Sequence, residues 1–492
     1  MSDEIRIQLA IGLPWVAVLW AILFNQRPNL REIGTLGFGL SLFGVIMSLA
    51  SDVFAGARPE WVAAEILPGF ALSFRLEPLG MLFALVASGL WTVTTCYAIG
   101  YMRAHHEGHQ TRFYACFAIA MNAAMGAAMA SNLFTLFVFY ELMTLSTYPL
   151  VTHHGTEKAM LGGRTYLGIL MSTSIAFLML AIVWTWSKTG TLEFVPGGIF
   201  NEIHQQNLIG TTELTILLAL FAFGTGKAAL MPFHRWLPAA MVAPTPVSAL
   251  LHAVAVVKVG VFTVMKIAVY TFGIELLHDT GISEWLMYVA GASVLIASLI
   301  ALTKDNLKAR LAYSTISQLS YITLGAALAC PAGIIGGSMH IAMHAVGKIT
   351  LFFCAGAIYV ATHKTEISQM RGLGRQMPIT MGAFLLGSFS IIGLPPFGGT
   401  WSKWYLAEGA AAINQPIFIA VLMISSLLNI AYLLPVAIGG FYLKDAQEPS
   451  GIKEAPLMCV LPLCLTAIGG IALFFFADRL YEVLLPIAHS TP

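Results

Sequence analysis

Charged residues lie inside segments of this sequence that are otherwise strongly apolar. Five lysines fall within long hydrophobic segments rather than at their ends: Lys227, Lys258, Lys266, Lys348 and Lys403. Glu141 lies near the middle of another such segment. A charge at the centre of a membrane-spanning helix costs about 2.5–3.5 kcal/mol unless it is paired or hydrated. Because one central carboxylate cannot neutralise five lysines, the pattern indicates hydrated, titrating groups that carry protons or cations. The alternative is a buried salt bridge that only ties helices together.

Histidines add titratable groups to the same pattern. His340, His344 and Lys348 have i, i+4, i+8 spacing, which puts all three on one face of a helix. Imidazoles titrate near neutral pH, so this stripe suits a proton relay. One alternative is that the two histidines form hydrogen bonds in a polar seam and take no part in transport. Haem ligation is a weaker alternative, because it normally takes histidines from facing helices. His252 lies six residues before Lys258, on a different face, and is a secondary candidate. The remaining histidines singled out are expected in solvated loops: His105, His106, His109, His153 and His154.

The lysines differ in what their positions allow. The proton affinity of a buried lysine depends on whether a carboxylate lies beside it, so a Glu–Lys pair that opens and closes acts as a switch. Glu141 and Lys227 are the candidates for that pair. Lys258 is too central to reach the membrane surface, whereas Lys266 lies near the outer end of its helix and has the length to reach it. Lys266 is therefore a secondary candidate.

Composition indicates that a helical membrane bundle positions these residues. The 492 residues are 58% hydrophobic and 10% charged, with a mean hydropathy of +0.80, whereas soluble domains have about 25% charged residues. A membrane-spanning helix needs about 20 mostly apolar residues. On that rule the sequence predicts an all-α polytopic membrane protein with fourteen spans, at residues 5–24, 33–53, 78–102, 113–130, 132–152, 164–187, 211–234, 247–272, 285–303, 309–330, 334–362, 378–411, 415–441 and 456–477.

Charge distribution predicts how the bundle lies in the membrane. Most of the 25 lysines and arginines fall in loops that follow odd-numbered spans, which makes those loops cytoplasmic by the positive-inside rule. The opposite loops hold only Arg6, Arg58, Arg75, Lys188 and Arg479. Both termini are therefore expected outside the cytoplasm. The first span is expected to remain in the protein and not to be cleaved as a signal peptide. The net charge of +1 gives no indication of nucleic-acid binding.

Cofactor and catalytic signatures are missing from the sequence. The six cysteines are scattered in apolar stretches without Cys-x-x-Cys spacing, which removes the basis for iron–sulfur, zinc or c-type haem sites. Gly224-Thr225-Gly226-Lys227 resembles the end of a phosphate-binding loop, but Phe221 replaces the first glycine and no strand precedes it. No cofactor, metal or catalytic chemistry is therefore expected, and the energy for transport must come from an ion gradient or a partner.

One short motif occurs twice and breaks two of the predicted spans with prolines. Leu230-Met231-Pro232-Phe233 followed by Trp236 matches Leu394-Pro395-Pro396-Phe397 followed by Trp401. The two copies lie on the seventh and twelfth spans, five helices apart, and must therefore run in opposite directions through the membrane. This arrangement is typical of an inverted repeat, in which broken helices flank an ion site.

Several longer segments resemble antiporter-like membrane subunits in order over residues 75–440. They are Asn132 to Leu150 with Glu141, Gly226 to Trp236, Ala243 to Gly260 with its Pro-Thr-Pro sequence, Leu311 to Gln318, His340 to Lys348, and Gly393 to Lys403. The family comprises subunits of Mrp-type sodium/proton antiporters, respiratory complex I and membrane-bound hydrogenases. Lysine at position 403 is most similar to the D-type component of the Mrp antiporters.

The resemblance implies an architecture and a role. It implies three N-terminal helices in residues 1–112, inverted five-helix repeats in 113–272 and 285–441, and a final helix in 442–492. It implies the Glu141–Lys227 pair, a central Lys258, a relay on the eleventh helix and a terminal Lys403. Protons, with Na⁺ or K⁺ as the possible exchanged cation, would then move through a subunit of a hetero-oligomeric antiporter in the inner membrane of a bacterium. The alternatives are a proton-pumping subunit of an NADH–quinone or hydrogenase-type complex and a non-conducting scaffold that binds quinone or lipids.

Overall fold

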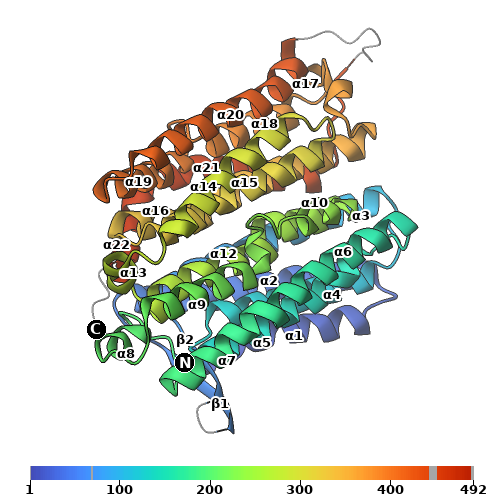
Figure 1. Ribbon diagram of the computed structural model, residues 1–492. Helices are drawn as coiled ribbons and strands as arrows, with labels where there is room; N and C mark the ends of the chain where they lie inside the picture. The colour runs from blue at the N-terminus through green and yellow to red at the C-terminus, as the bar shows by residue number, and fades with distance from the viewer. Residues whose placement is uncertain (1, 68–69, 443–450, 489–492) are drawn as a thin grey trace.

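Long helices that run side by side form almost the whole molecule (Figure 1). The computed structural model describes residues 2–67, 70–442 and 451–488. Ten helical stretches in these ranges are long and apolar enough to cross a membrane. They are α1 (Asp3–Leu23), α2 (Pro28–Phe54), α3 (Pro78–Ala104), α5 (Leu133–Val151), the continuous Glu157–Thr189 stretch that contains α6 (Glu157–Thr173) and α7 (Met179–Thr189), the Thr245–Phe272 stretch that contains α11 (Thr245–Ala249) and α12 (Val256–Ile267), α14 (Glu284–Leu302), α16 (Pro331–Thr362), α20 (Pro416–Tyr442) and α21 (Leu457–Phe475).

Four further helices complete the correspondence with the fourteen predicted spans. Two are long enough to cross a membrane but are more polar than the ten stretches above: α4 (Gln110–Ala128) and α15 (Leu307–Ala327). Two are short apolar helices that end at chain breaks: α9 (Thr211–Gly224) and α18 (Pro378–Ile392). Together these findings confirm a polytopic, all-α membrane protein, because the sequence supplies long apolar helices and the structure packs them into one bundle.

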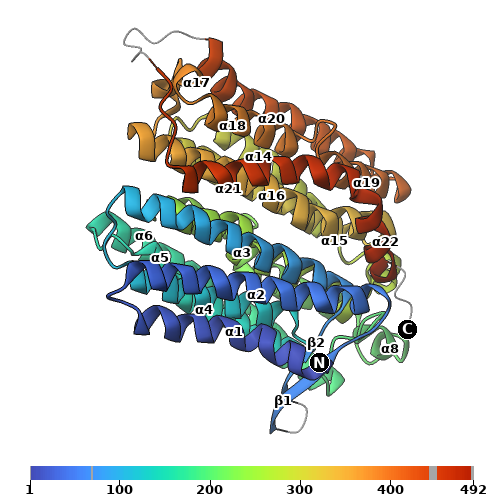
Figure 2. The same ribbon diagram turned by 180° about the vertical axis from the view of Figure 1, so that it is seen from behind.

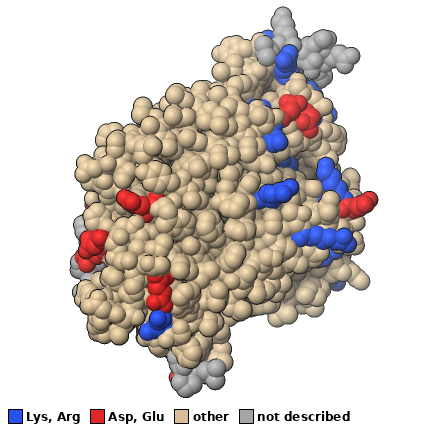
Figure 3. All heavy atoms as spheres, in the orientation of Figure 1, with Lys and Arg blue, Asp and Glu red and all other residues tan. Residues whose placement is uncertain are grey.

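The core lies where α12 and α16 pass through the bundle. Nearly every residue of both helices is buried. The outer helices instead expose large apolar side chains, such as Leu19, Leu427 and Ile468. In the space-filling view, the middle of the surface is almost free of charge, and lysines and arginines gather at one end (Figure 3). An apolar belt between charged ends is what a bilayer-embedded surface requires.

Two helices are broken within the bundle, as the prolines predict. After α9 the chain makes a short turn at Gly226–Ala228 before the small α10 (Trp236–Ala239). After α18 it turns at Gly393 and resumes as α19 (Gly399–Ala412). The peptide bonds Met231–Pro232 and Pro395–Pro396 are both cis. Gly393 has a φ of +87°, and a Cβ there would lie 2.9 Å from the side chain of Lys403, so glycine is required at this break.

Several small elements at one end of the bundle were not predicted. β1 (Glu60–Leu67) and β2 (Phe70–Arg75) form an antiparallel hairpin between α2 and α3, with Glu60 opposite Arg75. The short α8 (Phe200–Gln205), α13 (Ile274–Thr280) and α22 (Ala477–Ala488) lie at the same end, as does the beginning of α1 (Figures 1 and 2). We call this the hairpin end. The opposite end, with the α3–α4, α5–α6 and α14–α15 loops, is called the basic end.

Candidate functional site

The centre of the site is a direct contact between α12 and α16. The Nζ atom of Lys258 lies 2.5 Å from Nδ1 of His344, and both side chains are buried. The other ring nitrogen of His344 has no hydrogen-bond partner among the described residues. An amine and an imidazole at this distance can share or exchange a proton. The structure therefore brings together two of the residues predicted from separate segments.

His340 extends this contact toward the second broken helix. Its Nδ1 lies 2.9 Å from Oγ of Ser402, and its Nε2 lies 3.1 Å from Oε1 of Gln318. The ring stacks between His344, at 5.7 Å between centroids, and Tyr321, at 5.4 Å. The i, i+4 spacing thus places both imidazoles on one face, as predicted. The polar path continues to α19 through Ser402.

Lys403 lies at the far end of this path, against the end of α18. Its Nζ donates to the carbonyl oxygens of Ile391 at 2.9 Å and Ile392 at 2.8 Å, and to Oγ of Ser426 at 3.1 Å. The last carbonyls of a helix have no intrahelical donors and carry the negative end of the helix dipole. The break after α18 therefore provides a place for a buried ammonium without a carboxylate.

Lys348 lies one turn beyond His344 on α16 and points to another partner. Its Nζ donates to Oγ of Ser314 at 2.7 Å. The hydroxyl of Tyr432 also donates to Ser314, at 2.9 Å, and hydrogen-bonds to Asn429. Lys348 is thus held by a hydroxyl network between α15 and α20. Its spacing places it in line with the histidines, but its hydrogen bond leads to this network.

Glu141 and Lys227 lie near each other but are not paired. The Nζ of Lys227 donates to Oγ1 of Thr144 at 2.6 Å and lies 3.1 Å from the ring centroid of Tyr140. The Tyr140 hydroxyl accepts the backbone N–H of Lys227 at 3.0 Å. The carboxylate oxygens of Glu141 are buried and have no hydrogen-bond partner in the described ranges. The structure therefore shows no hydrogen bond or ion pair between the two residues predicted to act together.

The turn that carries Lys227 is held against α12. A Cβ on Gly260 would lie 2.3 Å from the backbone carbon of Lys227, so only glycine permits this approach. Gly260 lies two residues after Lys258. The first broken helix and the central lysine are therefore positioned by one packing contact.

The two secondary candidates have different surroundings. Both ring nitrogens of His252 are buried and lack partners among the residues described, and its ring lies 4.9 Å from that of Phe352. The prediction that Lys266 could reach the membrane surface is wrong. Its side chain is fully buried, with Nζ 3.4 Å from Oε2 of Glu77 and 2.6 Å from the carbonyl oxygen of Ala130. The partner from the start of α3 holds the lysine inward.

One of the histidines expected in a solvated loop is also buried. His153 follows α5 and is only 4% exposed, with its ring against Phe113. Burial, helped by the positive charge of Arg112, lowers the pKa of His153 to about 4. The side chain of Arg112 donates to the backbone carbonyl of His153 at 2.9 Å. The loop is therefore packed against α4, and His153 is neutral at physiological pH.

Sequence reasoning missed the hydroxyl and amide groups that hold the charged residues. These are Tyr140, Thr144, Ser314, Gln318, Ser402, Ser426, Asn429 and Tyr432. Some carry a spacing signal: Thr144 lies three residues after Glu141, and Gln318 lies four residues after Ser314. Within the described ranges, no three His, Cys, Asp or Glu side chains converge to hold a metal ion.

Comparison with known proteins gives consistent matches over most of the chain. The family model described as "NADH:quinone oxidoreductase/Mrp antiporter, TM" matches residues 130–429. The N component of NADH-quinone oxidoreductase from Desulforudis audaxviator is 30% identical, over 90% of this chain and 89% of the relative. The D component of the Na(+)/H(+) antiporter from Alkalihalophilus pseudofirmus is 26% identical, over 98% of this chain and 96% of the relative.

Two solved structures have the same fold. One polypeptide of the Mrp complex from Dietzia sp. superposes with a TM-score of 0.84 and 22% identity, over 98% of this chain and 97% of its own length. One polypeptide of the membrane-bound sulfane sulfur reductase, an archaeal respiratory membrane complex, has a TM-score of 0.86 and 21% identity, with the same shares covered. Both structures are multisubunit membrane complexes.

Proposed function

Because this chain belongs to the transmembrane subunit family shared by NADH:quinone oxidoreductases and Mrp antiporters, we propose that it conducts protons in a multisubunit monovalent cation/proton antiporter. The observation that carries this proposal is the buried line of Lys258, His344 and His340, whose successive groups are in hydrogen-bonding or stacking contact. Protons cross such a line by transfer between neighbouring titratable groups.

Each titratable group has a role in this proposal. Lys258 is the central carrier, and His344 and His340 relay the proton to the second broken helix, with Lys348 on the same helix. Lys403 is the gate to the opposite half-channel. Its ammonium is held by carbonyls at the break after α18, so movement of that break would change its proton affinity.

The pair on the other side of Lys258 acts as the switch. Glu141 is the modulating carboxylate and Lys227 its movable partner. Lys227 is held by Thr144 while the Glu141 oxygens lack partners in the described chain, which supports a pair that can close. Closing would stabilise the charged form of Lys227, and opening would favour release of its proton.

We also propose the repeat arrangement and orientation predicted from the sequence. Residues 113–272 and 285–441 form two inverted repeats, and the matching breaks after α9 and α18 support this division. The basic end faces the cytoplasm, because it carries the lysine and arginine excess. Both termini then lie on the other side of a bacterial plasma membrane.

A proton-pumping subunit of a redox complex is the second candidate. It is favoured by the 30% identity to an NADH-quinone oxidoreductase subunit, above the 26% identity to the antiporter subunit. The antiporter proposal is favoured by near-complete coverage of the antiporter subunit and by a lysine at position 403. In both candidates, the same buried residues carry the proton.

Affinity purification from native membranes, followed by mass spectrometry, distinguishes the two candidates. Co-purification with small hydrophobic membrane proteins, together with proton movement in vesicles on addition of Na⁺ or K⁺, supports the antiporter. Co-purification with flavin or iron–sulfur subunits, together with proton movement driven only by an electron donor, overturns it in favour of the redox complex. Absence of any proton movement in both assays contradicts proton conduction itself.

A further inference from the structure

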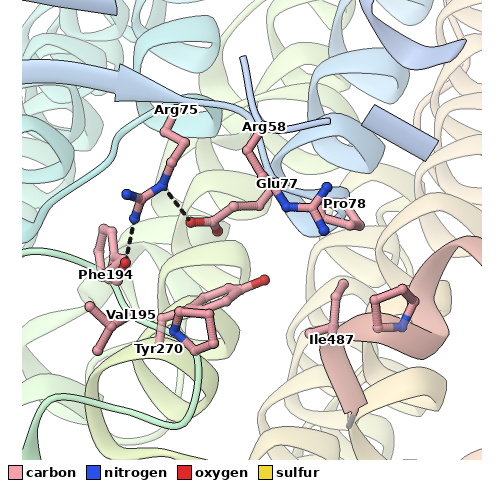
Figure 4. A pocket seen from close by; sticks show the side chains of 10 residues that line it. Arg58, Arg75, Glu77, Pro78, Phe194, Val195, Tyr270 and Ile487 are labelled. Carbon is pink, nitrogen blue, oxygen red and sulfur yellow. Dashed lines mark hydrogen bonds and ion pairs between the residues drawn. The ribbon is translucent and has the colours of Figure 1, made fainter. Parts of the chain in front are cut away.

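A cavity of about 440 Å³ opens at the hairpin end (Figure 4), and none of the proposed midplane groups lines it. It is lined by Arg58 from the loop after α2, Arg75 and Glu77 from the segment leading into α3, Tyr270 and Val195. Residues of α22 form another wall. The exposed rim residue Arg58 shows that the cavity reaches the surface.

Glu77 lies between the cavity and the interior of the protein. On the cavity side, its Oε1 lies 3.7 Å from Nε of Arg75, which also donates to the carbonyl oxygen of Phe194 (Figure 4). On the inner side, its Oε2 lies 3.4 Å from Nζ of Lys266. Oε2 is buried and has no hydrogen-bond partner in the described part of the chain. Glu77 thus contacts a surface cation and a fully buried cation at once.

Lys266 lies on the same helix as the central carrier. Lys258, Phe262 and Lys266 follow one another at intervals of four residues along α12, so that each neighbours the next, and the Nζ of Lys266 lies 5.7 Å from the ring centroid of Phe262. Eight residues of α-helix separate the two lysines by about 12 Å. Phe262 lies between them, fully buried and 5.1 Å from the ring of Phe83. One aromatic layer therefore separates the midplane lysine from the lysine at the cavity.

We propose that the Glu77–Lys266 pair is the proton-release site of the first repeat at the hairpin end, and that Phe262 with Phe83 is the barrier behind it. This inference rests on the proposed function. The ammonium of Lys266 gives a proton to the Glu77 carboxylate, and the carboxyl group passes it to water in the cavity. When the aromatic barrier opens, the neutral Lys266 amine is reprotonated at the expense of Lys258, which restores the Glu77–Lys266 pair and leaves a neutral Lys258 amine for the midplane groups to reprotonate.

The surrounding charges favour release over uptake at this site. The groups that face the pair are Arg58, Arg75, Tyr270 and, at longer range, Glu193. The two guanidinium groups oppose the return of a proton from the cavity, since like charges repel. Glu193 is more distant and is hydrogen-bonded to Asn132 at 3.2 Å. A net positive vestibule beside a carboxylate is an arrangement suited to one-way discharge.

The test uses the intact complex in sealed vesicles with a pH-sensitive dye. Glu77→Gln and Lys266→Met are each expected to lower driven proton transport by about 100-fold, the scale of losing a positioned proton-transfer group. Phe262→Ala is expected to do the opposite and raise the passive proton leak without a driving cation or electron donor. Glu32→Gln is the matched control, because Glu32 is a buried carboxylate that pairs with the exposed Arg103 at the basic end and should leave transport unchanged.

A second measurement avoids dependence on these buried substitutions. Val195 lines the cavity and is not a member of the ion pair. With the Val195→Cys variant, a membrane-impermeant thiol reagent added from the hairpin side is expected to block transport. The same reagent added from the basic side should have no effect. Transport by Glu77→Gln and Lys266→Met at the native rate, together with no block at Val195→Cys, overturns the proposal. If that happens while Lys258→Met still abolishes transport, the midplane path stands and only this release site fails; native transport by Lys258→Met would instead contradict the proposed function.

Discussion

Replacing Lys258 with methionine removes the amine that contacts His344 while keeping most of the side-chain volume. A charged lysine at the centre of a membrane helix costs about 2.5–3.5 kcal/mol. In the described part of the chain, the Lys258 amine recovers one hydrogen bond, to His344, which is worth about 1 kcal/mol. The methionine variant should therefore be more stable than the native protein by about 2 kcal/mol, and its thermal unfolding midpoint should rise.

The same substitution should abolish transport. Loss of a positioned proton-transfer group lowers rates by about 100-fold or more, and Lys258 is the central carrier in the proposed relay. Proton movement is measured with the purified complex in liposomes that contain a pH-sensitive dye, alongside the thermal unfolding midpoint. Greater stability with lost transport is the expected combination, because the lysine is retained for proton transfer and not for folding.

Lys258→Arg is the matched control for charge. Arginine keeps the positive charge but does not release its proton in proteins, so this variant should also fail to transport. Transport at the native rate by either Lys258→Arg or Lys258→Met would refute the reasoning. It would show that Lys258 supplies at most a fixed charge, or no function, and that protons cross elsewhere.

Three further results are expected. Glu141→Gln and Lys227→Met should each abolish transport in the vesicle assay while the protein remains inserted in the membrane, since each removes one member of the switch. Tyr432→Phe removes the hydroxyl that donates to the serine beside Lys348; thermal unfolding should show a loss of about 1 kcal/mol with slower, not abolished, transport. The pKa of His153 is about 4 when folded and about 6.5 when unfolded, so protons bind the unfolded state more tightly. The contribution of His153 to the free energy of unfolding is therefore fully present above about pH 6.5 and is lost as the pH falls from about 6.5 to 4. The His153→Asn variant should show a weaker pH dependence of the thermal unfolding midpoint in that range.

The sequence was sufficient to identify the helices and the buried lysines, for one physical reason. Charge is so costly in a membrane that each buried lysine stands out against its apolar neighbours. Helical periodicity then placed His340 and His344 on one face without knowledge of the packing. The breaks after α9 and α18 were also predictable, because proline interrupts helical hydrogen bonding.

The contacts between helices could not be predicted in the same way. The pairing of Lys266 with Glu77 joins residues far apart in the sequence, and nothing in either segment identifies the other. The hairpin at 60–75 was missed because a search for apolar runs of about 20 residues passes over short strands. Serine, threonine and tyrosine occur throughout the helices, so the hydroxyls that hold Lys227 and Lys348 were not distinguishable from ordinary packing residues until the helices were placed together.

The continuity of α16 has a mechanical consequence. This helix runs unbroken from Pro331 to Thr362 and holds His340 and His344 a fixed number of turns apart, so the length of that transfer step is set by helix geometry. Lys227 instead lies in the short turn after α9, and Lys403 lies near the start of α19, against the break that follows α18. In the proposed relay, the unbroken α16 therefore keeps the spacing between its titratable groups constant, whereas a movement of either broken helix would change the surroundings of Lys227 or Lys403.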